Sequence, residues 1–160
     1  MEQLLTLAEQ IGGRLKARGE TIAVAGSSSG GLISAALLSV PGASAYFLGG
    51  AVVYTAKARA RFMDLPREAV ADMRSASEPY ALLLAKTARS NFSATWGLSE
   101  TGAAGPSGNP YGDAPGHSCI AVSGLGERVI TIETGDADRA RNMRAFAKAA
   151  LMMLWESLGA

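Results

Sequence analysis

Hydrophobic positions along the chain alternate between helical and strand-like spacing. Near the N-terminus, leucine, alanine and isoleucine recur at the spacing of an amphipathic helix, which Gly19 ends. Further along, β-branched and aromatic residues gather in short runs bounded by glycine and proline, which is typical of buried strands. The predicted helices span residues 2–18, 32–40, 55–63, 67–73, 77–90 and 136–158. The predicted strands span residues 21–25, 45–54, 95–100, 118–123 and 128–133.

The order of these elements indicates the fold class. Helices and strands alternate in the first half, and Gly124–Glu127 joins the last two strands as a hairpin. We therefore expect an α/β fold, a three-layer α/β/α sandwich around a mixed, mainly parallel sheet. Gly49 and Gly50 fall inside the second strand and indicate a bulge or a close approach there. Residues 1–160 are expected to form one domain.

Composition supports a globular chain and excludes several function classes. Hydrophobic residues make up 48% and charged residues 18% of the sequence, enough for a sizeable core. The net charge of +1 gives no reason to expect binding to nucleic acid or to a membrane surface. One Cys and one His cannot form a disulfide or a usual zinc site, so no metal and no other cofactor is predicted. Neither a signal peptide nor a membrane helix is evident, and a cytoplasmic location is expected.

A glycine-rich turn between a strand and a helix is the first candidate site. The segment Ala25–Gly31 has this arrangement and contains Ser27, Ser28 and Ser29. Such a turn offers free backbone N–H groups and the positive end of a helix dipole, which suit a phosphate or a developing oxyanion. A serine on it can be a nucleophile if a base is nearby. A tight turn with serines as helix caps is the alternative.

A second glycine-rich segment, Glu100–Gly108, follows another buried strand and opens an unstructured loop that ends at Gly116. Ligands of open α/β sheets bind outside the carboxyl ends of the strands, so both glycine-rich segments are expected at one sheet edge. Loops of this length in compact domains are often functional. An ordinary long connection is the alternative.

Two groups of cations and one histidine complete the candidate chemistry. The first group lies on the helix predicted over 55–63 and comprises Lys57, Arg59 and Arg61. The second lies at the start of the last helix, where cations oppose the helix dipole unless they face an anion, and comprises Arg139, Arg141 and Arg144. Solvated basic faces are the alternative for both groups. His117 and Cys119 share one face of a strand, and a Ser27–His117 pair stays open beside a structural role for the histidine.

Taken in order, these motifs resemble the CinA C-terminal domain family over nearly the whole chain. The turn at Ala25–Gly31 is similar to the family's A-E-S-x-T-G-G, and Thr101–Pro106 matches its T-G-I-A-G-P. Four further segments resemble family patterns. Pro41–Ser44 resembles P-G-A/S-S, and Phe47–Arg59 resembles F-x-G-G-x-V-x-Y-S-N-E-A-K. Ser75–Glu78 resembles A-V-S-E, and Gly135–Arg141 resembles G-D-R-x-x-x-R.

Studied members of that family are nicotinamide-nucleotide amidases. The resemblance therefore implies an amidohydrolase that converts nicotinamide mononucleotide to nicotinate mononucleotide and ammonia, with Ser27 as nucleophile and Tyr54 and Thr101 as its partners. Backbone N–H groups and guanidinium forks suit phosphate oxygens. The expected ligand-binding residues are Ser28, Ser29, Gly30, Gly31, Gly102, Gly105, Arg139 and Arg141. The expected partners are a small nucleotide substrate and further copies of the chain in a homo-oligomer.

The catalytic centre departs from the family pattern. The family's Glu is Gly26 here and its Lys falls on Arg59, which does not act as a general base at neutral pH. Lys57 could stand in as the base if the fold desolvates it, although residues 57 and 59 point about 200° apart on a helix. Glu100 is an additional acid just before the second loop.

Three functions follow from this comparison of motifs. The leading one is a stand-alone CinA-like amidohydrolase, favoured by the retained Ser27, Tyr54 and Thr101. The second is a catalytically silent nucleotide-binding protein, favoured by the departures at Gly26 and Arg59. The third is a hydrolase of changed substrate with Glu100 as acid or base. On the first reading, Ser27, Tyr54, Arg59 and Thr101 should line one pocket.

Overall fold

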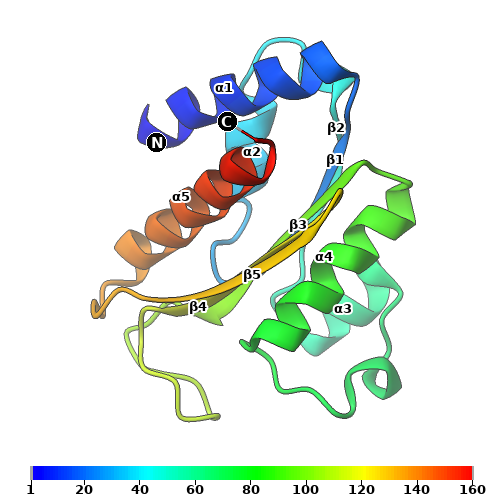
Figure 1. Ribbon diagram of the computed structural model, residues 1–160. Coiled ribbons are helices and arrows are strands. Elements are labelled where there is room, and N and C mark those ends of the chain that lie inside the picture. Colours follow the sequence, from blue (N-terminus) through cyan, green and yellow to red (C-terminus); the bar gives the residue numbers. More distant parts are fainter. Residues whose placement is uncertain (1, 160) are drawn as a thin grey trace.

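In the computed structural model, which describes residues 2–159, one sheet separates two layers of helices (Figure 1). One layer comprises α1 (Glu2–Arg18), α2 (Leu32–Leu38) and α5 (Arg139–Ser157), and the other α3 (Ala56–Met63) and α4 (Glu78–Phe92). The strands are β1 (Ile22–Gly26), β2 (Phe47–Val52), β3 (Trp96–Ala103), β4 (His117–Ser123) and β5 (Glu127–Glu133). The predicted three-layer α/β/α fold is confirmed.

The sheet has the strand order β2-β1-β3-β4-β5. β1 runs parallel to both β2 and β3, while β4 runs antiparallel to β3 and β5. The sheet is mixed and mainly parallel, as predicted: within residues 2–159, β1, β2, β3 and β5 run in one direction and β4 runs against them. The connections between β1, β2 and β3 carry the crossover helices that parallel neighbours need, whereas β3, β4 and β5 follow one another without a helix.

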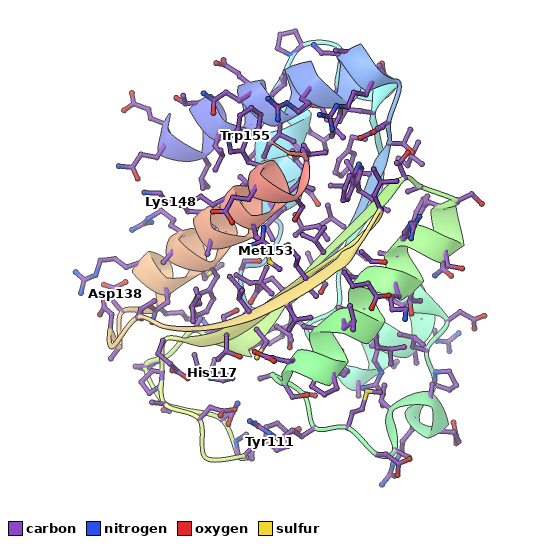
Figure 2. All side chains as sticks on the ribbon, viewed as in Figure 1. Tyr111, His117, Asp138, Lys148, Met153 and Trp155 are labelled. Atoms are coloured by element: carbon purple, nitrogen blue, oxygen red, sulfur yellow. The ribbon has the colours of Figure 1, made fainter. Side chains whose placement is uncertain are left out.

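The hydrophobic core lies mainly between the sheet and the α1, α2 and α5 layer. Its largest fully buried side chains include Trp96, Tyr46 and Leu98. A smaller cluster fills the space between the sheet and the α3 and α4 layer. Figure 2 shows the two sides of α5, with Met153 toward the sheet and Lys148 on the outer face of the helix. Amphipathic spacing thus places each helix as the sequence indicates.

Several predicted boundaries differ from the structure, among them the start of the last helix, which is Arg139 and not residue 136. The helix expected over 67–73 is only a 3₁₀ turn, Arg67–Val70, because Val70 alone in that turn is buried and no apolar face supports a longer helix. The loop expected from Thr101 begins later, since β3 continues to Ala103. The extension is held by pairing of Thr101, Gly102 and Ala103 with β4.

Gly49 and Gly50 mark both a bulge and a close approach, as the sequence predicts. The register between β1 and β2 shifts just before Gly49. A Cβ atom at Gly49 would lie 2.7 Å from the Phe92 ring, and one at Gly50 would lie within the contact radius of Ser34. The absence of side chains therefore lets α2 and α4 approach β2.

Burial on the central strand predicts a large loss of stability for one leucine. Leu98 on β3 is fully buried, whereas Leu125 in the β4–β5 hairpin is 82% exposed. Leu98→Ala should lower the free energy of unfolding by about 2–5 kcal/mol, because it removes core contacts and leaves a cavity. Leu125→Ala, the same truncation at the surface, should change it by less than about 0.5 kcal/mol. Denaturant titration of both variants measures the difference; equal losses would contradict this description of the core.

Candidate active site

A cleft opens at the edge where the three parallel strands end. Its volume is about 380 Å³. The structure brings Ser27, Tyr54, Arg59 and Thr101 together in its lining, from the ends of β1, β2 and β3 and from α3. The carboxyl ends of parallel strands meet at one edge, so residues far apart in the chain converge there. The remaining lining residues are Val53, Thr55, Ala56, Ser75, Ala76, Tyr80, Gly102, Asn109, Pro110 and Tyr111.

A second compartment of about 240 Å³ adjoins the cleft. It holds Arg139, Ser28 and the segment Gly102–Gly105. The two compartments share Tyr54, Gly102, Asn109 and Pro110. Together they have the size of a small-molecule site.

Two backbone amides of the serine turn, residues 27–31, are engaged by a side chain of the protein. The N–H groups of Ser27 and Ser29 donate to Glu100 Oε2 at 3.2 and 2.7 Å. The expected oxyanion or phosphate site on this turn therefore lacks the Ser27 and Ser29 amides, because a carboxylate of the protein already occupies them. Gly30 and Gly31 line neither compartment.

Ser27 and Thr101 differ in how firmly their hydroxyls are held. The half-buried Ser27 hydroxyl makes no hydrogen bond to the described part of the chain and lines the cleft. The buried Thr101 Oγ1 accepts from the Ala76 N–H at 3.3 Å. Ser27 is thus the free hydroxyl of this pair, and Thr101 fixes the wall formed by Ser75 and Ala76.

The two cations of α3 lie in different surroundings. Arg59 is buried, lines the cleft and donates from Nε to the Leu65 carbonyl at 3.2 Å. Lys57 is exposed and lines neither compartment. The Thr55 hydroxyl caps α3 by accepting from the Ala58 N–H, which sets the direction of this first turn. The structure therefore brings Arg59 to the site and leaves Lys57 outside it.

The arginines of α5 are also separated. Arg139 lines the second compartment and donates to the Gly105 carbonyl at 2.6 Å and to the Tyr54 hydroxyl at 3.1 Å. Arg141 forms a bidentate ion pair with Asp136, at 2.7 and 3.0 Å, and lines neither compartment. The Arg141 guanidinium and the Asp138 N–H lower the pKa of Asp136 to about 2. Of the two, Arg139 is the cation available to a ligand.

His117 does not pair with Ser27, so that open possibility is wrong. Its Nδ1 lies 2.5 Å from Glu133 and its Nε2 lies 2.8 Å from the Ala76 carbonyl. Burial opposes the charged imidazole, but the hydrogen bonds to Glu133 and Ala76 and the charges of Asp113 and Glu133 outweigh it and raise the pKa of His117. His117 and Cys119 do share one face of β4, as predicted, and His117 Nε2 lies 3.7 Å from Cys119 Sγ.

The long loop after β3 is held by its own polar residues. Asp113 forms a bidentate pair with Arg74, at 2.5 and 3.2 Å, and accepts from Asn109 at 2.7 Å. The Arg74 guanidinium is the main cause that lowers the pKa of Asp113. Figure 2 shows Tyr111 and His117 at the same end of the molecule, with Tyr111 on this loop. The loop thereby forms one wall of the cleft.

Several residues of this wall carry no individual signal in the sequence. Ser75 and Ala76 fall inside a quoted family motif, but no chemistry marks them as lining residues. Asn109 and Tyr111 lie in the loop flagged for its length, which is a signal for the segment and not for the side chains. Tyr80 reads as a residue of the apolar helix face.

Within residues 2–159, no group of three or more histidine, cysteine, aspartate or glutamate side chains is arranged to hold a metal ion. The same part of the chain contains no helix long and apolar enough to cross a bilayer.

The fold and the cleft define an α/β protein with a small-molecule-sized site at the carboxyl edge of its parallel strands. The family described as "CinA C-terminal domain" matches residues 4–158. The chain therefore belongs to the CinA C-terminal domain family.

Longer relatives carry the same domain. A CinA-like protein of Anaeromyxobacter sp. (strain K) is 39% identical over 150 residues, which cover 92% of this chain and 37% of the relative. A CinA-like protein of Chlorobium limicola is 36% identical over 159 residues, or 96% of this chain and 37% of the relative. The chain thus spans a little over a third of the length of these relatives.

Solved structures share the fold. The competence/damage inducible protein CihA from Agrobacterium tumefaciens superposes with a TM-score of 0.87 at 28% identity, covering 99% of this chain and 96% of that one. A CinA superfamily protein from Klebsiella pneumoniae superposes with a TM-score of 0.89 at 22% identity, covering 97% of each chain. The second likeness is one of fold alone.

The surroundings of His117 predict a pH dependence of stability. Its pKa in the folded state is raised above the ordinary value of 6.5, so its stabilising contribution is fully present below that pH and lost as the pH rises through the folded pKa. Asp113 has a lowered pKa, and burial raises the pKa of Cys119 above its ordinary value of 9.0, so neither changes charge between about pH 6 and 8. Denaturant midpoints measured across this range should fall for the wild type and stay flatter for His117→Gln. If the denaturant midpoint changed equally with pH in both proteins, His117 would not be the group responsible for the pH dependence.

Proposed function

We propose that this chain is an amidohydrolase that acts on the carboxamide of a pyridine nucleotide, nicotinamide mononucleotide being the first candidate, with Ser27 as nucleophile. The observation that carries the proposal is the unengaged Ser27 hydroxyl in a cleft shared with Tyr54, Arg59 and Thr101. The relatives are named only as CinA-like or competence/damage inducible proteins, so the activity rests on the site and on the motif resemblance.

The two compartments suit the two ends of such a ligand. Arg139 uses two of the five N–H donors of its guanidinium on Gly105 and Tyr54, which leaves donors for phosphate oxygens. The main cleft carries the aromatic side chains of Tyr54, Tyr80 and Tyr111, which suit a flat pyridine ring. The proposal therefore places the phosphate by Arg139 and the carboxamide by Ser27.

The reaction needs no redox step. Ser27 Oγ bonds to the carboxamide carbon, and the C–N bond then breaks to release ammonia, which carries away the hydroxyl proton. Water cleaves the resulting ester, leaving a carboxylate and restoring Ser27. The permanent charge of Arg59, whose Nε alone is engaged within residues 2–159, can stabilise the oxyanion of each step but cannot accept a proton.

Binding without turnover is the second candidate, and one observation favours it. None of the residues that line either compartment is a lysine, histidine, aspartate or glutamate. Lys57 is exposed outside the cleft, and the Glu100 carboxylate is engaged by the serine turn. A protein of this kind would hold the nucleotide at Arg139 and leave the amide intact.

Ammonia release decides between the two candidates. Purified protein should release ammonia from nicotinamide mononucleotide, and Ser27→Ala should lower the rate at least about 10³-fold, because the nucleophile is lost. The binding of the nucleotide, measured by calorimetry, should be retained in Ser27→Ala. Binding by the wild type with no ammonia release would overturn the amidase proposal in favour of the binding protein.

The placement of the arginines predicts which of them holds the phosphate. Arg139→Ala should weaken binding of nicotinamide mononucleotide by about 1.5–3 kcal/mol, the typical value of a hydrogen bond to a charged group. Arg141→Ala is the matched control, since Arg141 is paired with Asp136 outside the compartments, and it should leave the affinity within about threefold. Calorimetric titrations measure both. A larger loss in Arg141→Ala would place the phosphate elsewhere.

A further inference from the structure

Glu100 is the most completely engaged ionisable side chain near the cleft. It lies on β3 opposite Ile120 of β4 and is fully buried. Among residues 2–159, no lysine, arginine or histidine forms an ion pair with it. A buried carboxylate without a cation persists only where hydrogen-bond donors satisfy it.

Those donors come mainly from the serine turn. Glu100 Oε2 accepts from the Ser27 N–H, the Ser29 N–H and the Ser29 hydroxyl, at 3.2, 2.7 and 2.6 Å. Oε1 accepts from the Ser28 hydroxyl and, at 3.1 Å, from the Ser118 hydroxyl on β4. Four of the five donors thus belong to three consecutive residues of the turn. The carboxylate ties the turn to the centre of the sheet.

This contact fixes the residue that the proposed function uses. The Ser27 backbone is held by Glu100, while the Ser27 hydroxyl is left to the cleft. Apart from Glu100, the turn is held by the hydrogen bond from the Gly30 N–H to the Ser27 carbonyl at 2.9 Å. Its last two residues, Gly30 and Gly31, are glycines, and no side chain caps α2. Without Glu100, two buried amides and two serine hydroxyls would lose their acceptor.

We propose that Glu100 is a positioning residue that holds the serine turn in the conformation presenting Ser27 to the cleft. Its effect on turnover rests on the proposed function, while its effect on the turn does not. The contact between Glu100 and the turn also affects where the anionic group of a ligand can bind. Because Glu100 fills the anion position at the Ser27 and Ser29 amides, the anionic group of a ligand is directed to Arg139.

Two substitutions separate positioning from proton transfer. In Glu100→Gln, the amide oxygen can replace Oε2 and accept from the Ser27 and Ser29 amides. The amide nitrogen can then donate to the Ser28 and Ser118 hydroxyls, which turn round to accept. Glu100→Ala removes every acceptor. Glutamine thus keeps the turn and deletes the charge, whereas alanine deletes both.

Amide hydrogen exchange of Ser27 and Ser29, followed by NMR, reports on the turn whether or not the protein turns over. Exchange of both amides should be at least about tenfold faster in Glu100→Ala and within about threefold of wild type in Glu100→Gln. Unchanged exchange in a folded Glu100→Ala protein would overturn the proposal. So would fast exchange in Glu100→Gln with full turnover, and this result is decisive even if the alanine variant does not fold.

Turnover gives the second readout. With nicotinamide mononucleotide, Glu100→Ala should lower kcat about 100-fold with little change in KM, because the nucleophile is misplaced while Arg139 still binds the phosphate. Glu100→Gln should retain kcat within about threefold. Loss of kcat in Glu100→Gln with protected amides would show Glu100 to be an acid or base and would overturn the positioning role. If the wild type has no activity, the amidase proposal fails, and hydrogen exchange still decides the role of Glu100.

Discussion

The parallel pairing of β1 with both of its neighbours is the constraint on which the site depends. Three strands that run in one direction must end at one edge, where short turns follow β1 and β2 and the long loop follows β3. Ser27, Tyr54 and Thr101 are brought together by this geometry although they are distant in sequence. The cap of α3 by Thr55 then determines that Arg59, and not Lys57, lies in the cleft.

The antiparallel half of the sheet supports the site without lining it. Ser118 and His117 lie on β4, next to the strand that carries Glu100 and Thr101. One contacts the Glu100 carboxylate, and the other holds the carbonyl of Ala76 in the cleft wall. These two hydrogen bonds connect β4 to the cleft, so a substitution in β4 that breaks one of them would affect the position of Glu100 or of the Ala76 carbonyl.

The sequence predicts the elements and their convergence better than the contacts within the site. Hydrophobic spacing indicates the major helices and all five strands, and the rule for parallel strands places Ser27 and Thr101 at one edge. The role of Glu100 is not predictable in this way, because its partners in the serine turn lie more than 70 residues earlier in the chain and only the folded sheet joins them.

The cations show the same limit at shorter range. Arg139 and Arg141 occupy one helical turn, and spacing alone does not decide which of them faces the compartment. The carboxylate of Asp136, close by in sequence, draws Arg141 away. Local competition between acceptors therefore decides which of the two arginines lines the compartment.

The glycine pair in β2 has a consequence for how this chain can change. The space that a side chain at Gly49 would fill belongs to Phe92, and the space at Gly50 belongs to Ser34. Each glycine is therefore coupled to one position on a helix, and the effects of changes at the two members of a pair do not add. A side chain at position 49 has to displace the partly exposed Phe92 ring, so the effect of that substitution on stability depends on which residue occupies position 92.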